Sequence, residues 1–171
     1  GVAILSYAHK QKADDQWLYL PALKRVKRIA SKNKSGPFLG SEFSFEDFSF
    51  QEVEKYEYEY VKDESYLGKD CFVIKRIPLD PYSGYTKQLV WIDKEDYLVQ
   101  KIHHFDRKSF HLKTQTFGEY KQYLGFFWQP HRIEMQNHQN GKSSVLKFEE
   151  VFFKQGLTAN DFSQNSLKRS R

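Results

Sequence analysis

Cysteine is nearly absent from this chain, because only Cys71 among its 171 residues carries a thiol. A single cysteine excludes a disulfide within the chain and any metal site built from several thiolates. Long apolar runs are also missing, since no stretch approaches the roughly 18 to 20 apolar residues that a membrane-spanning helix requires. The segment from Gly1 to Lys10 lacks the charged start and apolar run of a signal peptide. We therefore expect no helix that crosses a membrane.

Short catalytic motifs are missing as well. The sequence contains no phosphate-binding glycine loop, dinucleotide fingerprint, nucleophile elbow or two-histidine helix of zinc proteases. The acidic pairs Asp14-Asp15 and Glu46-Asp47 could serve as catalytic carboxylates, but adjacent acids at turns and caps more often solvate the chain. Cys71 lies between apolar neighbours, where a thiol is more often a packed side chain than a nucleophile. We therefore expect no enzymatic activity and no cofactor.

Aromatic residues, in contrast, are abundant. The chain has 15 Phe, 11 Tyr and 3 Trp, a mixture that favours strands over helices. Its length suits one core, so we expect a single domain over residues 1–171. Lysine and arginine outnumber the acids by 27 to 22, giving a net charge of +5 and a pI near 9.1. This balance permits contact with an acidic partner or an anionic membrane without requiring it.

Short alternating segments separated by turn residues predict about nine strands of a meandering antiparallel sheet. The clearest covers residues 55–64, where Tyr56, Tyr58 and Tyr60 recur with a period of two. The other segments are 3–10, 16–20, 24–30, 71–78, 87–93, 97–105, 110–123, 126–137 and 143–153. Asn140-Gly141 predicts a type I′ hairpin. Because twist accumulates over so many strands, we expect a curved sheet that forms an unclosed half β-barrel.

Two short helices are expected beside the sheet. In residues 41–50, Ser44 can cap a helical turn, Asp47 occupies its third position, and Phe43 and Phe48 can pack as a hydrophobic staple. The phenylalanines of this segment would plug an opening. Near the C-terminus, Thr158 with Asp161 predicts the start of a helix over residues 159–168.

Apolar residues appear on both faces of several predicted strands. Leu89 and Trp91 alternate with Val90 and Ile92, whereas a sheet with one core face and one wet face would show a clean alternation. The surplus apolar side chains could line a cavity on the concave face. Strand aromatics usually fill a core, but they can also line a pocket for acyl chains. The pattern alone leaves these two interpretations open.

Histidines and a basic run suggest two further kinds of site. His103, His104 and His111 lie close across one predicted hairpin, but the adjacent pair points to opposite faces and cannot serve one metal. Ordinary surface histidines are the simpler interpretation. The run from Lys24 to Arg28 has the cations of a nucleic-acid site, but it places them on both faces of a strand, as a solvated strand would. We therefore expect no metal and no nucleic acid.

Residues 15–29 (DQWLYLPALKRVKRI) and 40–47 (GSEFSFED) resemble the outer-membrane lipoprotein-sorting protein family of Gram-negative bacteria, within the LolA-like superfamily. The resemblance continues through Asp80-Pro81, residues 89–93, Trp128-Gln129-Pro130, Met135, Phe162 and residues 167–169. The Trp-Leu-Tyr-Leu-Pro run is its most specific part. Members typically have a signal peptide, a first helix and early strands before the region that matches Gly1, so we expect a fragment that lacks the N-terminal region.

The resemblance implies an unclosed antiparallel barrel, plugged by short helices, that binds lipid or lipoprotein acyl chains in the periplasm without catalysis. Members often occur beside transporters that export hydrophobic molecules, which implies a shuttle. The alternative is a protein-interaction module that docks on a membrane exporter through its basic strand and binds no lipid itself.

The family offers no site motif that can be placed on this chain, so the candidate ligand-binding residues are aromatic and aliphatic residues of the strands. These are Trp17, Tyr19, Tyr56, Tyr58, Tyr60, Phe72, Ile74, Leu89, Trp91, Ile133, Met135, Leu146 and Phe148. Arg25 and Arg28 are expected at the rim, where they would hold a lipid headgroup or an acidic partner.

Overall fold

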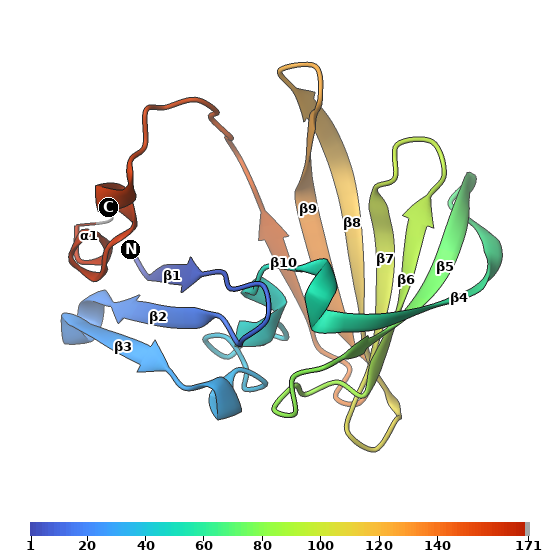
Figure 1. Cartoon of the computed structure of the whole chain (residues 1–171), viewed down its shortest axis with the longest axis horizontal. Helices are drawn as coiled ribbons and strands as arrows, with labels where there is room; N and C mark the ends of the chain where they lie inside the picture. The colour runs from blue at the N-terminus through green and yellow to red at the C-terminus, as the bar shows by residue number, and fades with distance from the viewer. Residues whose placement is uncertain (170–171) are drawn as a thin grey trace.

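The computed structural model describes residues 1–169, and within them the chain forms two antiparallel sheets (Figure 1). The small sheet has the order β1-β2-β3, with β1 at Ala3–Tyr7, β2 at Asp15–Leu20 and β3 at Arg25–Ile29. The large sheet has the order β10-β9-β8-β7-β6-β5-β4. Its strands are β4 (Tyr56–Tyr66), β5 (Lys69–Pro78), β6 (Lys87–Asp93), β7 (Val99–Phe105), β8 (His111–Tyr123), β9 (Phe127–Asn137) and β10 (Ser143–Lys147).

This architecture confirms the predicted class, a mainly antiparallel β fold whose sheet does not close. The expectation of one continuous sheet of about nine strands is wrong, because the ten described strands divide into three and seven. Residues 31–55, which separate the two groups, form short turns of 3-10 helix and one isolated bridge instead of a ladder. Their Ser, Gly and Pro residues disfavour strands, so β3 pairs with β2 alone.

The register of the large sheet assigns its side chains to two faces. Arg76 of β5 lies opposite Gln88 of β6, Gln88 opposite His104 of β7, and His104 opposite Lys113 of β8. These four residues, called the polar row below, therefore share one face. A neighbouring row of Ile74, Val90 and Ile102 lies on the same face. We call this the inner face.

The opposite, outer face has its own core. Val73 lies opposite Trp91, and both are buried with Cys71 under Tyr66 and Leu89. The prediction that Cys71 is a packed side chain is confirmed, since the thiol is fully buried.

Residues 31–55 connect the two sheets, and their centre is the 3-10 helix η3 (Phe45–Phe48). The predicted cap is confirmed: the backbone N–H of Ser44 donates to Asp47 Oδ2 over 2.7 Å. The staple is confirmed as well, with the rings of Phe43 and Phe48 5.7 Å apart. Gln16 of β2 donates to the Phe45 carbonyl, and Lys113 of β8 donates to the Glu42 carbonyl. The segment thus bonds to both sheets.

The chain beyond β10 arches away from the large sheet and returns to β1, where its last helices lie beside the N-terminus (Figure 1). It contains the 3-10 helix η5 (Ala159–Phe162) and α1 (Gln164–Leu167). The predicted helix over residues 159–168 is therefore interrupted, because Ser163 is extended and caps α1. The hydroxyl of Tyr7 donates to the Phe162 carbonyl and fastens this end to the small sheet.

Two smaller expectations need correction. The last long strand ends at Lys147, well before residue 153. The turn at Asn140-Gly141 is not type I′, which would need positive φ at both residues, because only Gly141 has it, at 73°. In the part of the chain that the structure describes, no helix has the length and apolar character needed to cross a membrane.

The buried ion pair between Lys113 and Asp47 generates a prediction about stability. Its atoms lie 2.8 Å apart, and the side chains are 4% and 2% exposed. Lys113→Met leaves the Asp47 carboxylate buried without its cation, so we expect the free energy of unfolding to fall by about 3 to 5 kcal/mol in urea titrations at neutral pH.

The exposed Lys147→Met variant is the control and should stay within about 0.5 kcal/mol of the parent. Adding Asp47→Asn to Lys113→Met should restore part of the loss. Equal losses in the two lysine variants would show that the pair does not hold the segment.

Candidate functional site

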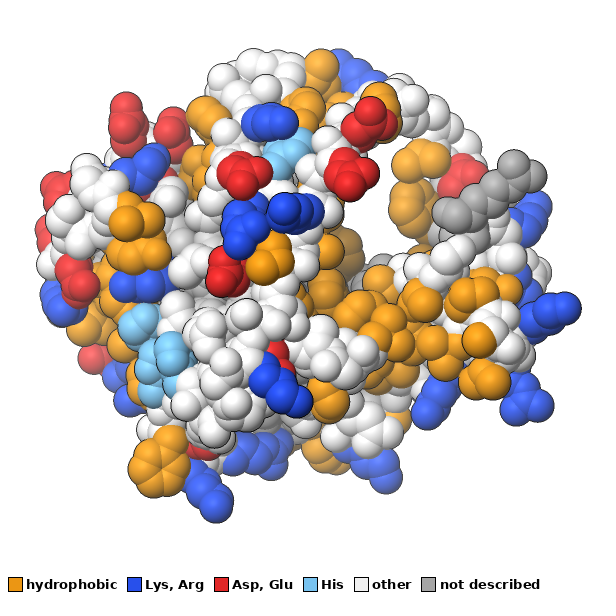
Figure 2. All heavy atoms as spheres, turned by 180° about the vertical axis from the view of Figure 1, so that it is seen from behind, with side chains coloured by type: hydrophobic (Ala, Val, Ile, Leu, Met, Phe, Trp, Pro, Cys, Tyr) orange, Lys and Arg blue, Asp and Glu red, His pale blue; other side chains and the backbone are white. Residues whose placement is uncertain are grey.

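A cavity of about 800 Å³ lies against the inner face of the large sheet. Its wall combines strands β4 to β9 and the loop after β5 with the turn between β1 and β2 and with residues of the segment 31–55 that connects the two sheets. Ligand pockets usually measure roughly 300 to 1,000 Å³, so the space suits a small-molecule ligand. From behind, the molecule is hollowed between the C-terminal arch and the large sheet, and hydrophobic side chains border the hollow (Figure 2).

The lining has an apolar part and a polar part. Much of the apolar lining comes from β7, β8, β9 and the loop before β7, with Leu98, Val99, Ile102, Phe117, Trp128, Pro130 and Ile133. The charged residues come from the connecting segment, the β1–β2 turn, β5 and the loop after it, and they are Lys12, Asp14, Lys34, Glu46, Asp47, Glu54, Lys55, Arg76 and Asp80. A ligand that filled this space would meet both kinds of surface.

A chain of hydrogen bonds joins three residues of the polar row, Arg76, Gln88 and His104, to Gln115 on the same face of β8. Arg76 Nε donates to Gln88 Oε1 over 2.5 Å, and Gln88 Nε2 lies 2.9 Å from His104 Nδ1. His104 Nε2 lies 3.1 Å from Gln115 Oε1. Because the amide of Gln88 donates to Nδ1, the ring carries its proton on Nε2 and donates it to Gln115. Burial lowers the pKa of His104 to about 3, so the ring is neutral.

Asp47 and Lys113 add a buried ion pair to the polar groups of the inner face. Tyr85 donates its hydroxyl proton to Asp47 Oδ1 over 2.7 Å, while Lys113 bonds to Oδ2. Burial opposes ionisation of Asp47, but the charge of Lys113 and the hydrogen bonds from Lys113 and the Ser44 N–H together hold its pKa below the ordinary value. Burial raises the pKa of Tyr85. The carboxylate is therefore charged and fully engaged within the protein.

Glu46 is the buried acid with the most unusual ionisation. Its two oxygens accept hydrogen bonds of 2.8 Å from the Ser83 hydroxyl and the Gly84 backbone N–H. Burial raises its pKa to about 7 despite these bonds. Gly84 allows this approach, because a Cβ at that position would lie 2.8 Å from the carboxylate and 2.9 Å from Ser35.

Of the thirteen candidate ligand contacts, Tyr56 and Ile133 line the cavity. Six more share the inner face by register: Tyr58, Tyr60, Phe72, Ile74, Met135 and Leu146. Leu89 and Trp91 lie on the outer face, opposite Lys75 and Val73. Phe148 follows β10, and its N–H donates to the His131 carbonyl. A ligand contact by any of these residues stays a prediction.

The remaining candidates lie on the small sheet. Trp17 packs its ring against Tyr7 at 5.2 Å, and Tyr19 lies opposite Ala3 and Val26. Arg25 and Arg28 are exposed on β3, and Arg28 forms an ion pair with Asp15. None of these four residues lines the cavity. They belong to the layer of the molecule that the C-terminal helices contact.

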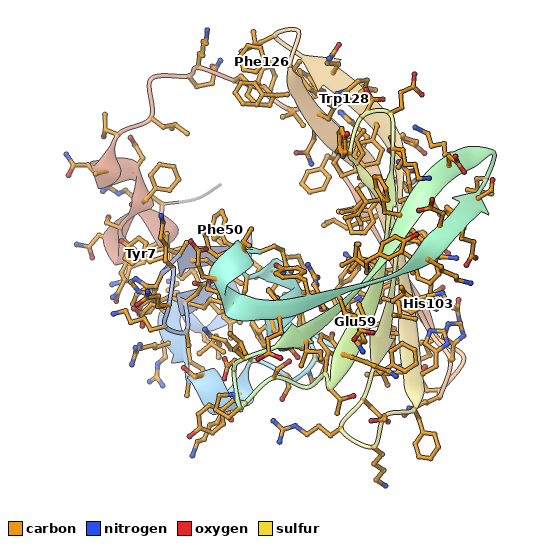
Figure 3. The ribbon with its side chains drawn as sticks, turned by 45° about the vertical axis from the view of Figure 1, so that its right-hand side comes forward. Tyr7, Phe50, Glu59, His103, Phe126 and Trp128 are labelled. Carbon is orange, nitrogen blue, oxygen red and sulfur yellow. The ribbon has the colours of Figure 1, made fainter. Side chains whose placement is uncertain are left out.

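The histidines separate as the alternation predicted. The ring of His103 lies against that of His111, and His111 against His138, each pair tilted with ring centres 4.4 Å apart, on the outer face (Figures 2 and 3). His104 lies on the inner face and is only 1% exposed, so its interpretation as a surface residue is wrong. Within residues 1–169 no group of three or more His, Cys, Asp or Glu side chains is arranged to hold a metal ion.

Sequence reasoning missed the polar row. Arg76, Gln88, His104 and Lys113 occupy alternate positions of correctly predicted strands, so their polarity among apolar neighbours was a usable signal. Their cross-strand register was the missing information, because it brings together residues that are far apart in sequence.

Comparison with known proteins places this geometry in a family. No curated protein matches the chain. A family model described as "Uncharacterized protein" matches residues 1–169. The crystal structure of a "putative outer membrane lipoprotein-sorting protein domain" from Vibrio parahaemolyticus is 55% identical, with a TM-score of 0.95 over 98% of this chain and 72% of that chain.

The chain belongs to the outer-membrane lipoprotein-sorting protein family. A DUF1329 family protein from Desulfovibrio piger is 26% identical, with a TM-score of 0.91 over 98% of this chain and 71% of that one. A LolA superfamily protein from Nitrosomonas europaea is 19% identical, with a TM-score of 0.70 over 96% of this chain and 89% of its own, which shows a shared fold. The resemblance seen in the sequence is thus confirmed.

Glu46 generates a prediction about pH. Its folded-state pKa lies above the ordinary 4.5, so its contribution to stability is fully present below pH 4.5 and is lost as the pH rises through 7. Glu46→Gln removes this titration. As the pH rises from 4.5 to 8, we expect the unfolding free energy of the parent to fall by about 3 kcal/mol relative to that of the variant. The exposed Glu57→Gln variant should show a constant difference, and a parallel profile for Glu46→Gln would contradict the assignment.

Proposed function

We propose that this protein binds lipid or lipoprotein acyl chains in the cavity and carries them through the periplasm, as a non-catalytic member of the lipoprotein-sorting family. The single observation that carries the proposal is the cavity of about 800 Å³, apolar along β7, β8 and β9, in a chain of this family. The relatives are described as a lipoprotein-sorting domain and a LolA superfamily protein, and these descriptions supply the class of cargo.

Exposed aromatic side chains near the cavity support transfer of an apolar cargo. Phe50 lines the cavity and is 54% exposed, while Trp128 lines it from β9. Figure 3 shows Phe50 on one side of the opening, with Trp128 and Phe126 across from it. Phe126 is 64% exposed at the tip of the β8–β9 hairpin. Large apolar groups left in water mark sites that another apolar surface covers.

Chain length provides the test of this proposal. Each buried methylene contributes roughly 0.8 kcal/mol, so two additional carbons should improve affinity about tenfold until the cavity is full. Displacement of a fluorescent fatty acid by unlabelled acids of increasing length measures this dependence. Ile133→Trp narrows the cavity and should shift the limit to shorter chains, whereas Arg132→Trp on the other face should not. Failure of every amphiphile to displace the probe would disprove the carrier.

A second candidate function is docking on a membrane exporter, and one observation favours it. β3 is an edge strand of the small sheet; Arg25 and Lys27 are exposed on it, and Lys24 is exposed just before it. Among residues 1–169 the ion pairs involve none of these three cations, although Arg28 is paired. Lysines also protect edge strands from pairing with other chains, so the observation needs its own experiment.

Charge reversal at Lys24, Arg25 and Lys27 tests whether these cations bind an exporter or only keep the edge strand from pairing with other chains. If β3 contacts an acidic face of an exporter, the triple Glu variant should lose cross-linking to that transporter in membranes. A module that only docks would bind no fatty acid in either form, whereas a carrier would keep its affinity for fatty acid in the variant. The matched control reverses the exposed Lys121, Lys142 and Lys147 and should cross-link as the parent does. Equal cross-linking by the two triple variants would exclude a role for the strand.

A further inference from the structure

Arg76 is a half-buried cation in the cavity wall that forms no ion pair with an acidic side chain among the described residues. Burial lowers its pKa, yet a guanidinium remains charged in proteins. Among residues 1–169, no carboxylate lies within ion-pair distance of it. Because burying an unpaired charge is costly, buried charges usually have a partner. The cavity is where such a partner could enter.

The other buried charged groups around the cavity already have ion-pair or hydrogen-bond partners. Lys55 forms an ion pair with Asp14, and Lys34 donates to the Asp14 carbonyl. Asp47 is paired with Lys113, and Glu46 accepts from Ser83 and Gly84. Lys12 also lines the cavity but is exposed to water. An anion in the cavity would therefore meet, besides the exposed Lys12, two cations that form no ion pair among the described residues, Lys34 and Arg76. Of these two, Arg76 offers the flat two-pronged donor geometry and lies on the sheet beside the apolar strands.

The polar row holds the Arg76 guanidinium in a defined orientation. Nε is used by Gln88, whose amide is fixed in turn by the neutral ring of His104. The guanidinium carbon lies 4.7 Å from the centre of the Tyr56 ring, which stacks against it. No hydrogen bond found within residues 1–169 uses the two terminal Nη groups. A fixed guanidinium with free Nη groups matches the two oxygens of a carboxylate or phosphate.

Apolar residues lie on the same face, one row away. Ile102 lies beside His104 on β7 at the next inward position, and it lines the cavity with Val99 and Phe117. An acyl chain whose head is bound at Arg76 would extend over these three residues. The surface thus changes from cationic to apolar along the cavity.

We propose that the cavity selects anionic amphiphiles, with a carboxylate or phosphate head bound by the Arg76 guanidinium and the chain lying over Ile102, Val99 and Phe117. This inference rests on the proposed carrier function and adds the class of cargo and its direction in the cavity. It assigns to Arg76 the headgroup role that the sequence suggested for Arg25 and Arg28.

The test compares a long-chain fatty acid with its methyl ester, which has the same chain and no charge. Displacement titrations should show the parent protein binding the acid roughly 10- to 100-fold more tightly, as expected for charge-assisted hydrogen bonds. Arg76→Met should remove this preference and leave ester affinity within about twofold. The control Arg132→Met, on the outer face, should keep the preference.

Each outcome decides the question. Equal affinity of the parent for acid and ester overturns the inference and leaves the carrier function intact, whereas binding of neither overturns the carrier function itself. Inorganic phosphate should not displace the acid at millimolar concentration; strong displacement would indicate a free-anion site instead of a headgroup site. If Arg76→Met does not fold, Arg76→Lys replaces it, and its ratio of acid to ester affinity should fall several-fold because the two-pronged geometry is lost.

Discussion

The buried pair of Asp47 and Lys113 is the interaction on which the rest of the structure depends. Asp47 caps η3 through the Ser44 N–H and also binds the Lys113 ammonium on the inner face. A local turn is thereby fixed to the centre of the large sheet. Because Gln16 of β2 bonds to the same turn, the pair also determines where the small sheet lies. The connecting segment occupies one part of the inner face and leaves the remainder as cavity.

Polar groups on the inner face of a sheet are tolerated only when each has a partner. Gln88, His104 and Gln115 meet this condition through a single directional chain, in which each donor faces an acceptor. The direction of the whole chain follows from Arg76, since a guanidinium can only donate. Replacing Arg76 with an uncharged residue would remove the donor to Gln88 Oε1, and the Gln88 amide could then rotate. The row therefore behaves as a unit, and its cationic end lies in the cavity wall.

Local patterns in the sequence were sufficient to predict most of the secondary structure. The period of two located β4, and the spacing of Ser44 and Asp47 located the cap, because both signals lie within a few residues. The division into two sheets and the concave face were not predictable in this way. Leu89 and Trp91 are as apolar as Val90, and only the register with β5 and β7 shows which of them face outward. For the same reason, the sequence did not show which residues of the neighbouring strands lie beside Arg76.

The composition of the cavity wall constrains what it can hold. A wholly apolar cavity would accept a hydrocarbon in any orientation, since hydrophobic contact has no direction. Here the polar row interrupts the apolar surface, and an alkyl group placed against Arg76 would remove water from an unpaired charge at a cost. A ligand of the kind that we propose would therefore bring a polar group of its own to that end, while its chain would gain by lying along β7 and β8. This difference between the two ends would determine the orientation of the ligand. It would also permit release, because water can again solvate the Arg76 guanidinium when the headgroup leaves.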